Sequence, residues 1–136
     1  MLLPWVGICL NFLGKFTSKM KPDNVIQQKS YAFAIHTFHL CRSLKAAREF
    51  DLARQLFKSG TSIGANVEEA IGAQSGKDFI MKMSIAYKEC RETHYWLRLA
   101  RDTSILPHEA IDQHIEQTIE LLRILSSILR SMKAKQ

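Results

Sequence analysis

Residues 111–132 read IDQHIEQTIELLRILSSILRSM, and their apolar side chains recur at alternating steps of four and three residues. This spacing is typical of a heptad seam, in which a helix packs at about 20° against its neighbours. A second apolar row beside the seam makes the helix apolar over more than one face. We therefore expect one face to fill a bundle core, and the other, with Leu121, Ile124 and Ile128, to contact another subunit.

Helical periodicity also marks three segments before this one, and the last helix is expected to start at Pro107. Asp23 or Asn24, after a proline, and Ser75, after a glycine-containing break, are residue types that cap helix N-termini. Short connections favour antiparallel neighbours. The sequence thus predicts an all-α fold, an up-down-up-down antiparallel four-helix bundle. The three earlier helices are expected at about residues 23–48, at about residues 51–73 and from residue 75 onward.

The apolar rows of these helices predict their buried faces. In the second helix two seam positions, Ser59 and Asn66, are polar, and a buried polar group without a partner costs about 1–3 kcal/mol. We expect these two, with Ser62 and Glu69, to bond to backbone or side chains across the bundle and fix its register. In the first helix the expected buried row is Tyr31, Ala34, Ile35, Phe38 and Cys41, widened by Phe33, Leu40 and Leu44.

Gly60 and Gly64 lie one helical turn apart and would let another backbone approach closely. Together with the second apolar row of the last helix, they are our candidate subunit interface. The sequence therefore predicts a bundle that associates with copies of itself.

Size and composition fit one soluble domain with a core of its own. The chain has 136 residues, of which 46% are hydrophobic and 24% charged, with a net charge of +6. Its cysteines, Cys9, Cys41 and Cys90, are odd in number and widely spaced, which favours small core residues in a reducing cytoplasm over a disulfide framework.

The start of the chain differs from the rest. Residues 1–19 are apolar up to Leu13 and then polar and basic, too short for a membrane-spanning helix and without the features of a secretory signal. We expect residues 1–21 to be an extension outside the core, with Met20 as the natural start, and residues 22–136 to form the bundle. A membrane-touching tether is the alternative.

The sequence contains only weak matches to motifs for catalysis or metal binding. The stretch GTSIG at residues 60–64 matches the pattern around a hydrolase nucleophile, but that motif needs a strand-to-helix turn and here lies in helical sequence. His36 and His39 are three residues apart, without the Glu-x-x-His pairs of di-iron bundles. His94 in the third helix fits a hydrogen-bonded interior histidine. We expect no catalytic residue, metal or cofactor, and no enzyme.

The densest basic region lies in residues 24–58 and is a candidate phosphate-contacting face. Aromatic residues interleave poorly with it along the chain, so base stacking is not expected from the sequence. A purely solvated face is the alternative interpretation. The candidate nucleic-acid contacts are Arg42, Lys45, Arg48, Arg54 and Lys58.

The stretches SGTSIGANVEEA (residues 59–70) and GAQSGKDFIMKMSIAYKECRETHYWLRLARD (residues 72–102) closely resemble the four-helix-bundle proteins of intervening sequences in bacterial 23S ribosomal RNA genes. The resemblance implies a cytoplasmic bundle that forms a homopentamer, without known catalytic residues or cofactors. Accessory proteins of diversity-generating retroelements are related in fold, and bind reverse transcriptase and nucleic acid. The most specific family positions correspond to Ser59, Ser62, Asn66, Glu69 and Glu89, which are interpreted as packing and hydrogen-bonding positions.

Together these features predict a self-associating helical scaffold or adaptor that touches RNA or DNA, or a protein that processes them, through basic surface residues. The alternative is a pure protein–protein interaction module, in which the charge serves only solubility. Salt-dependent binding to nucleic acid would separate the two.

Overall fold

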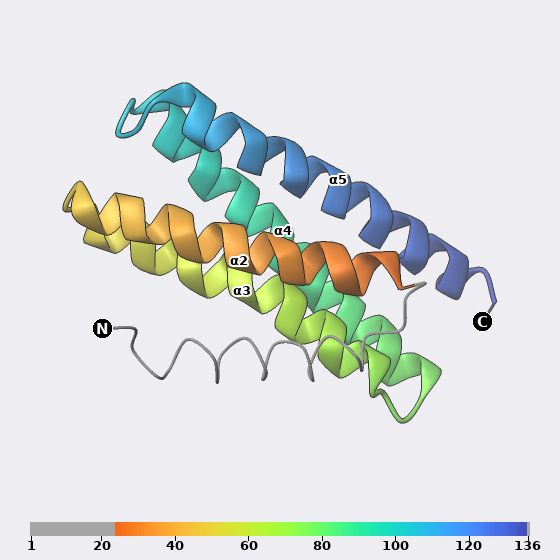
Figure 1. Cartoon of the computed structure of the whole chain (residues 1–136). Coiled ribbons are helices and arrows are strands. Elements are labelled where there is room, and N and C mark those ends of the chain that lie inside the picture. Colours follow the sequence, from red (N-terminus) through yellow and green to blue (C-terminus); the bar gives the residue numbers. More distant parts are fainter. Residues whose placement is uncertain (1–23, 136) are drawn as a thin grey trace, which may run out of the picture.

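A computed structural model describes residues 24–135, and the expected extension at residues 1–21 lies outside that range. The described residues form four helices: α2 (Val25–Ala46), α3 (Phe50–Ile71), α4 (Gly76–Asp102) and α5 (His108–Lys133). α2 and α4 run in one direction and α3 and α5 in the other, so the predicted up-down-up-down bundle is confirmed (Figure 1). Each helix packs against its neighbours in the chain, and α5 closes the bundle against α2.

The helix starts follow local capping chemistry. The Asn24 side chain accepts a hydrogen bond from the Gln27 N–H at 3.2 Å, and Ser75 Oγ accepts one from the Asp78 N–H at 3.1 Å. Both bonds satisfy N–H groups that a helix leaves without an internal partner. Pro107 stands one residue earlier than predicted, as the residue before the first helical position.

The heptad seam of α5 faces the core as predicted. Ile111, Thr118 and Leu125 are buried, and the remaining seam residues are partly buried against them. The one polar residue of the seam, Thr118, is satisfied by hydrogen bonds. Its Oγ1 donates to the Ile115 carbonyl oxygen at 2.7 Å and accepts a hydrogen bond from His94 on α4. α4 likewise supplies Met83, Ala86, Cys90 and Leu97 to the core.

The buried face of α2 differs from the prediction. Ile35 and Phe38 are 42% and 48% exposed, and Ser30 and Thr37 take buried positions instead, beside Phe33 and the other widening residues. These two small polar residues face the glycines of α3, so close approach of the helices, rather than hydrophobicity, selects them. The prediction was therefore wrong for Ile35 and Phe38, whereas Cys41 is buried as predicted.

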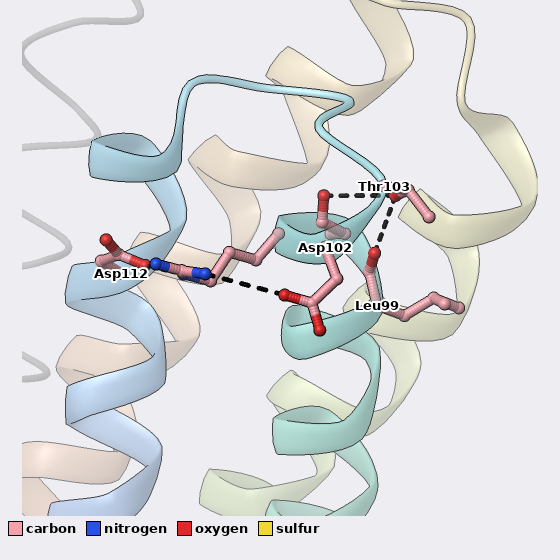
Figure 2. Close-up of polar contacts among 6 residues, drawn as sticks. Leu99, Asp102, Thr103 and Asp112 are labelled. Atoms are coloured by element: carbon pink, nitrogen blue, oxygen red, sulfur yellow. Dashed lines mark hydrogen bonds and ion pairs between the residues drawn. The ribbon is translucent and has the colours of Figure 1, made fainter.

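A polar contact holds the α4–α5 end of the bundle together. Arg101 Nε donates to Asp112 on α5, and its guanidinium also lies 3.6 Å from Asp102, as Figure 2 shows. The Thr103 hydroxyl donates to the Leu99 carbonyl oxygen at 2.7 Å where α4 ends. The bond from Arg101 to Asp112 ties the start of α5 to the last turn of α4, and the other two contacts lie within the end of α4.

Candidate nucleic-acid interface

The five basic residues predicted from the sequence lie around the turn between α2 and α3. Arg42 and Lys45 are on the last turns of α2, Arg48 is in the turn, and Arg54 and Lys58 are on the first turns of α3. All five side chains are exposed. Their position follows from the antiparallel hairpin, which brings the end of one helix beside the start of the next.

Three of these five residues share a hollow. Lys45, Arg54 and Lys58 line a depression of about 400 Å³ between α2 and α3, whereas Arg42 and Arg48 do not. Asp51 also lines it, and pairs with Arg54 at 3.0 Å although both side chains are at least 75% exposed. Exposed pairs of this kind contribute at most about 1 kcal/mol, so Arg54 can exchange this carboxylate for another anion at small cost.

Two aromatic side chains lie in the same hollow. Phe50 is 58% exposed and Phe57 is 44% exposed, and both line the depression with the three cations. Phe57 also makes an edge contact with Phe38 on α2, at 6.4 Å between ring centroids. The spacing of residues along α3 does not reveal that aromatic and basic side chains share this hollow, because Lys45 belongs to α2.

Arg48 adopts a left-handed backbone conformation, with φ of 63°. Its N–H donates to the Lys45 carbonyl oxygen at 2.9 Å, and the next N–H, of Glu49, donates to the Leu44 carbonyl oxygen at 2.9 Å. Glycine or asparagine usually takes this position after a helix, because other residues pay a steric penalty there. The turn therefore carries the long, positively charged side chain of Arg48 at a position where the backbone conformation favours glycine or asparagine.

The predicted cross-bundle polar network is largely local. Ser59 Oγ, Ser62 Oγ and Asn66 Nδ2 each donate to a carbonyl oxygen four residues earlier in α3, at 3.0, 2.6 and 2.8 Å. Ser62 thus lies within a helix, and the strand-to-helix turn of a hydrolase nucleophile is missing at this position. These three residues do not fix register between helices.

Two acidic residues of the same predicted set lie between α3 and α4. Glu69 on α3 accepts a hydrogen bond from Lys82 Nζ on α4 at 2.8 Å, and this bond raises the pKa of Lys82. Glu89 is half-buried, and burial, reinforced by Glu92, raises the pKa of its carboxyl group. Only Glu69 therefore has the cross-helix bond that was expected of the set.

The predicted subunit interface is largely used inside the chain. A Cβ on Gly60 would lie 2.7 Å from Thr37 Cγ2, and one on Gly64 would lie 3.3 Å from the Ser30 carbonyl oxygen. The close approach that these glycines allow is thus to α2 of the same chain, which corrects their assignment to a contact between subunits. Leu121 is buried in the core, and Ile124 and Ile128 are partly buried against it.

The histidines and cysteines have structural surroundings. His94 Nδ1 lies 2.9 Å from Thr118 Oγ1, and burial lowers the pKa of His94. Burial raises the pKa of Cys41 to about 11 and that of Cys90 to about 12, so both thiols stay protonated. Within residues 24–135, His, Cys, Asp and Glu side chains form no cluster of three or more that could hold a metal ion. His36 instead contacts Gln117 of α5 through Nδ1.

Fold and surface together define a small all-α protein, a four-helix bundle with a basic and aromatic hollow at one end. The chain belongs to the family of 23S rRNA-intervening sequence proteins, whose model matches residues 22–127. It is also similar to the crystal structure of a protein of unknown function from the S23 ribosomal protein family of Bacteroides thetaiotaomicron. The two chains are 40% identical, with a TM-score of 0.75 over 77% of this chain and 98% of that one.

No functionally curated protein matches this sequence. Among the helices in the described part of the chain, none is long and apolar enough to cross a membrane.

Proposed function

We propose that this protein is a non-enzymatic, self-associating helical scaffold of the bacterial cytoplasm. In this proposal it contacts nucleic acid, or a protein that processes nucleic acid, through the basic residues around the α2–α3 turn. The observation that carries the proposal is the hollow in which Lys45, Arg54 and Lys58 converge from two helices. Cations that converge on one depression can contact adjacent phosphates of one strand, and phosphate contacts supply most of non-specific affinity.

Self-association is supported by apolar surface that the bundle does not cover. Ile35 and Phe38 on α2 are exposed, and Ile124 and Ile128 on α5 keep part of their surface outside the core. The family resemblance suggests a ring of five subunits. Light scattering on the full chain and on a chain that starts at Met20 would measure the mass, and a monomer in both forms would contradict this part of the proposal.

Nucleic-acid contact is tested by the salt dependence of binding. Reversing the charges of the three cations that line the hollow, Lys45, Arg54 and Lys58, to Glu should weaken binding to RNA or DNA, and should flatten the plot of log affinity against log salt. Unchanged affinity and slope would contradict the assignment of this face. The matched control reverses Lys77, Lys88 and Arg130, which are also exposed but lie on α4 and α5, and should retain most of the affinity.

A second function, that of a pure protein–protein interaction module, is favoured by a different observation. The edge contact between Phe38 and Phe57 forms an exposed apolar ridge across α2 and α3. Exposed apolar surface of this kind marks contacts between proteins. If the protein binds no nucleic acid at low salt, this function becomes the better account of the face.

A further inference from the structure

The hollow at the α2–α3 end is unusual because its aromatic rings stay exposed in a chain that has a core to bury them in. Phe50 and Phe57 lie seven residues apart on α3, two helical turns, so they project from the same face about 10 Å apart along the axis. Both line the same depression, and each leaves roughly half of its side chain open to solvent. Two flat, exposed rings on a rigid helix form a surface on which planar groups can stack.

Three cations line the same hollow as these rings. Arg54 lies between Phe50 and Phe57 along α3, Lys58 follows Phe57 directly, and Lys45 borders the hollow from α2. Among residues 24–135, Asp51 is the only acidic residue that lines the hollow, and it is already paired with Arg54. The hollow therefore combines excess positive charge with open aromatic faces.

This combination matches the chemistry of a single nucleic-acid strand better than that of a duplex. Single strands present phosphates at regular intervals and unpaired bases that stack on aromatic side chains, whereas a duplex keeps its base faces inside. A purely electrostatic face needs no exposed phenylalanine. We propose that the hollow binds a single strand of RNA or DNA, with bases stacked on Phe50 and Phe57 and phosphates held by Lys45, Arg54 and Lys58. This inference rests on the proposed nucleic-acid contact and specifies its substrate class.

The test uses the full-length protein and three probes of about 12 nucleotides, a length within the range of known single-strand sites. They are a single-stranded oligonucleotide, a duplex, and an abasic oligomer that keeps the phosphates and lacks the bases. The stacking variant is Phe50→Leu with Phe57→Leu, which keeps apolar bulk and removes the flat rings. Both side chains are exposed, so the fold should tolerate the change. The control is Tyr95→Leu, at an aromatic residue of α4 that is 53% exposed.

The wild-type protein should bind the single strand more tightly than the duplex or the abasic oligomer. The double variant should lose about tenfold or more in affinity for the single strand, and less than about twofold for the other two probes, while Tyr95→Leu changes none of them. Equal wild-type binding of the single strand and the abasic oligomer would overturn the stacking inference and leave the proposed function standing.

Two further outcomes would also overturn the inference. If the wild-type protein binds none of the probes at low salt, the proposed nucleic-acid contact fails and the inference fails with it. If the double variant has a smaller mass in light scattering than the wild-type protein, the two rings belong to a contact between copies of this chain.

Discussion

The contact between α2 and α3, here called the α2–α3 seam, and the contact between α4 and α5, the α4–α5 seam, are stabilised in different ways. Between α2 and α3, Gly60 and Gly64 let the backbone approach Thr37 and Ser30, so shape sets the distance along this part of the contact, and Gln27 Nε2 adds a hydrogen bond to Glu68 at 3.0 Å near the start of α2. Between α4 and α5, Thr118 accepts a hydrogen bond from His94, and Arg101 bonds to Asp112. A seam closed by small residues tolerates no added atoms, whereas a polar seam tolerates changes of shape better than the loss of a partner.

The largest effect is expected from adding bulk to the first seam. Gly60→Leu should lower the free energy of unfolding by about 3 kcal/mol, because even the first added carbon meets the buried, stiff side chain of Thr37 at 2.7 Å. Denaturant titration followed by circular dichroism measures this. In the control, Gly76→Leu, no side chain within the described residues 24–135 lies within 4 Å of the new Cβ, so stability should stay unchanged or rise by up to about 1 kcal/mol. Equal behaviour of the two variants would contradict a seam set by shape.

A double-mutant cycle sharpens the same point. Thr37 Oγ1 is buried without a hydrogen-bond partner among residues 24–135, so Thr37→Ala removes both this hydroxyl and the methyl group that Gly60 faces. Gly60→Ala should therefore be destabilising alone and less so, or stabilising, in the Thr37→Ala background. The coupling free energy should be about 1 kcal/mol or more. If the effects of the two substitutions on the free energy of unfolding are strictly additive, the strain of Gly60→Ala does not come from its contact with Thr37.

Removing a partner should weaken the polar seam. Thr118→Val keeps the shape but leaves His94 Nδ1 without its acceptor, which should cost about 1–2 kcal/mol in free energy of unfolding. Thr93→Val is the matched control, because Thr93 is also buried but its hydroxyl bonds only to the Glu89 carbonyl oxygen of its own helix. Chemical denaturation compares the two, and a Thr93 effect as large as that of Thr118 would argue against a special role for the cross-helix bond.

The contrast between the seams also explains which features the sequence could predict. The caps at Asn24 and Ser75 and the seam of α5 depend on nearby residues, so their chemistry is visible in the chain. The buried positions of Ser30 and Thr37 depend on glycines of another helix, and a hydrophobic pattern assigns small polar residues to the surface. Helix periodicity alone therefore predicts a face correctly only where that face is filled by hydrophobic bulk.

The candidate site likewise has a part that the sequence could predict and a part that it could not. Local charge density along the chain was enough to single out Lys45, Arg54 and Lys58. Their shared hollow with Phe50 and Phe57 was missed, because it forms only when the α2–α3 turn folds back. A signal was present in the seven-residue spacing of the two phenylalanines, which places them on one helical face, away from the buried Leu56.

A smaller effect, of opposite sign, is expected where the α2–α3 hairpin turns. Arg48→Gly removes the steric penalty of a left-handed residue with φ of 63° and should raise the free energy of unfolding by about 1 kcal/mol. The control Arg42→Gly, in the helical part of α2, should lower it by a similar amount. Thermal and denaturant unfolding would reveal the signs. Loss of stability in Arg48→Gly would mean that its side chain contributes more than its backbone conformation costs.

The smallest effect concerns protonation of the polar seam. Because Thr118 Oγ1 donates to the Ile115 carbonyl oxygen, it accepts from His94, which therefore carries its proton on Nδ1. Burial, with the nearby Arg98 and Arg91, lowers the pKa of His94 below its usual 6.5, so the unfolded chain binds a proton there more readily than the folded chain. The contribution of His94 to stability is thus full above pH 6.5 and falls as pH decreases through 6.5 toward the lower folded pKa. His94→Gln should flatten the pH dependence of unfolding in this window, and only in part, because burial also lowers the pKa of His114. If His94→Gln and the exposed control His108→Gln give the same pH profile, protonation of His94 does not govern the α4–α5 seam.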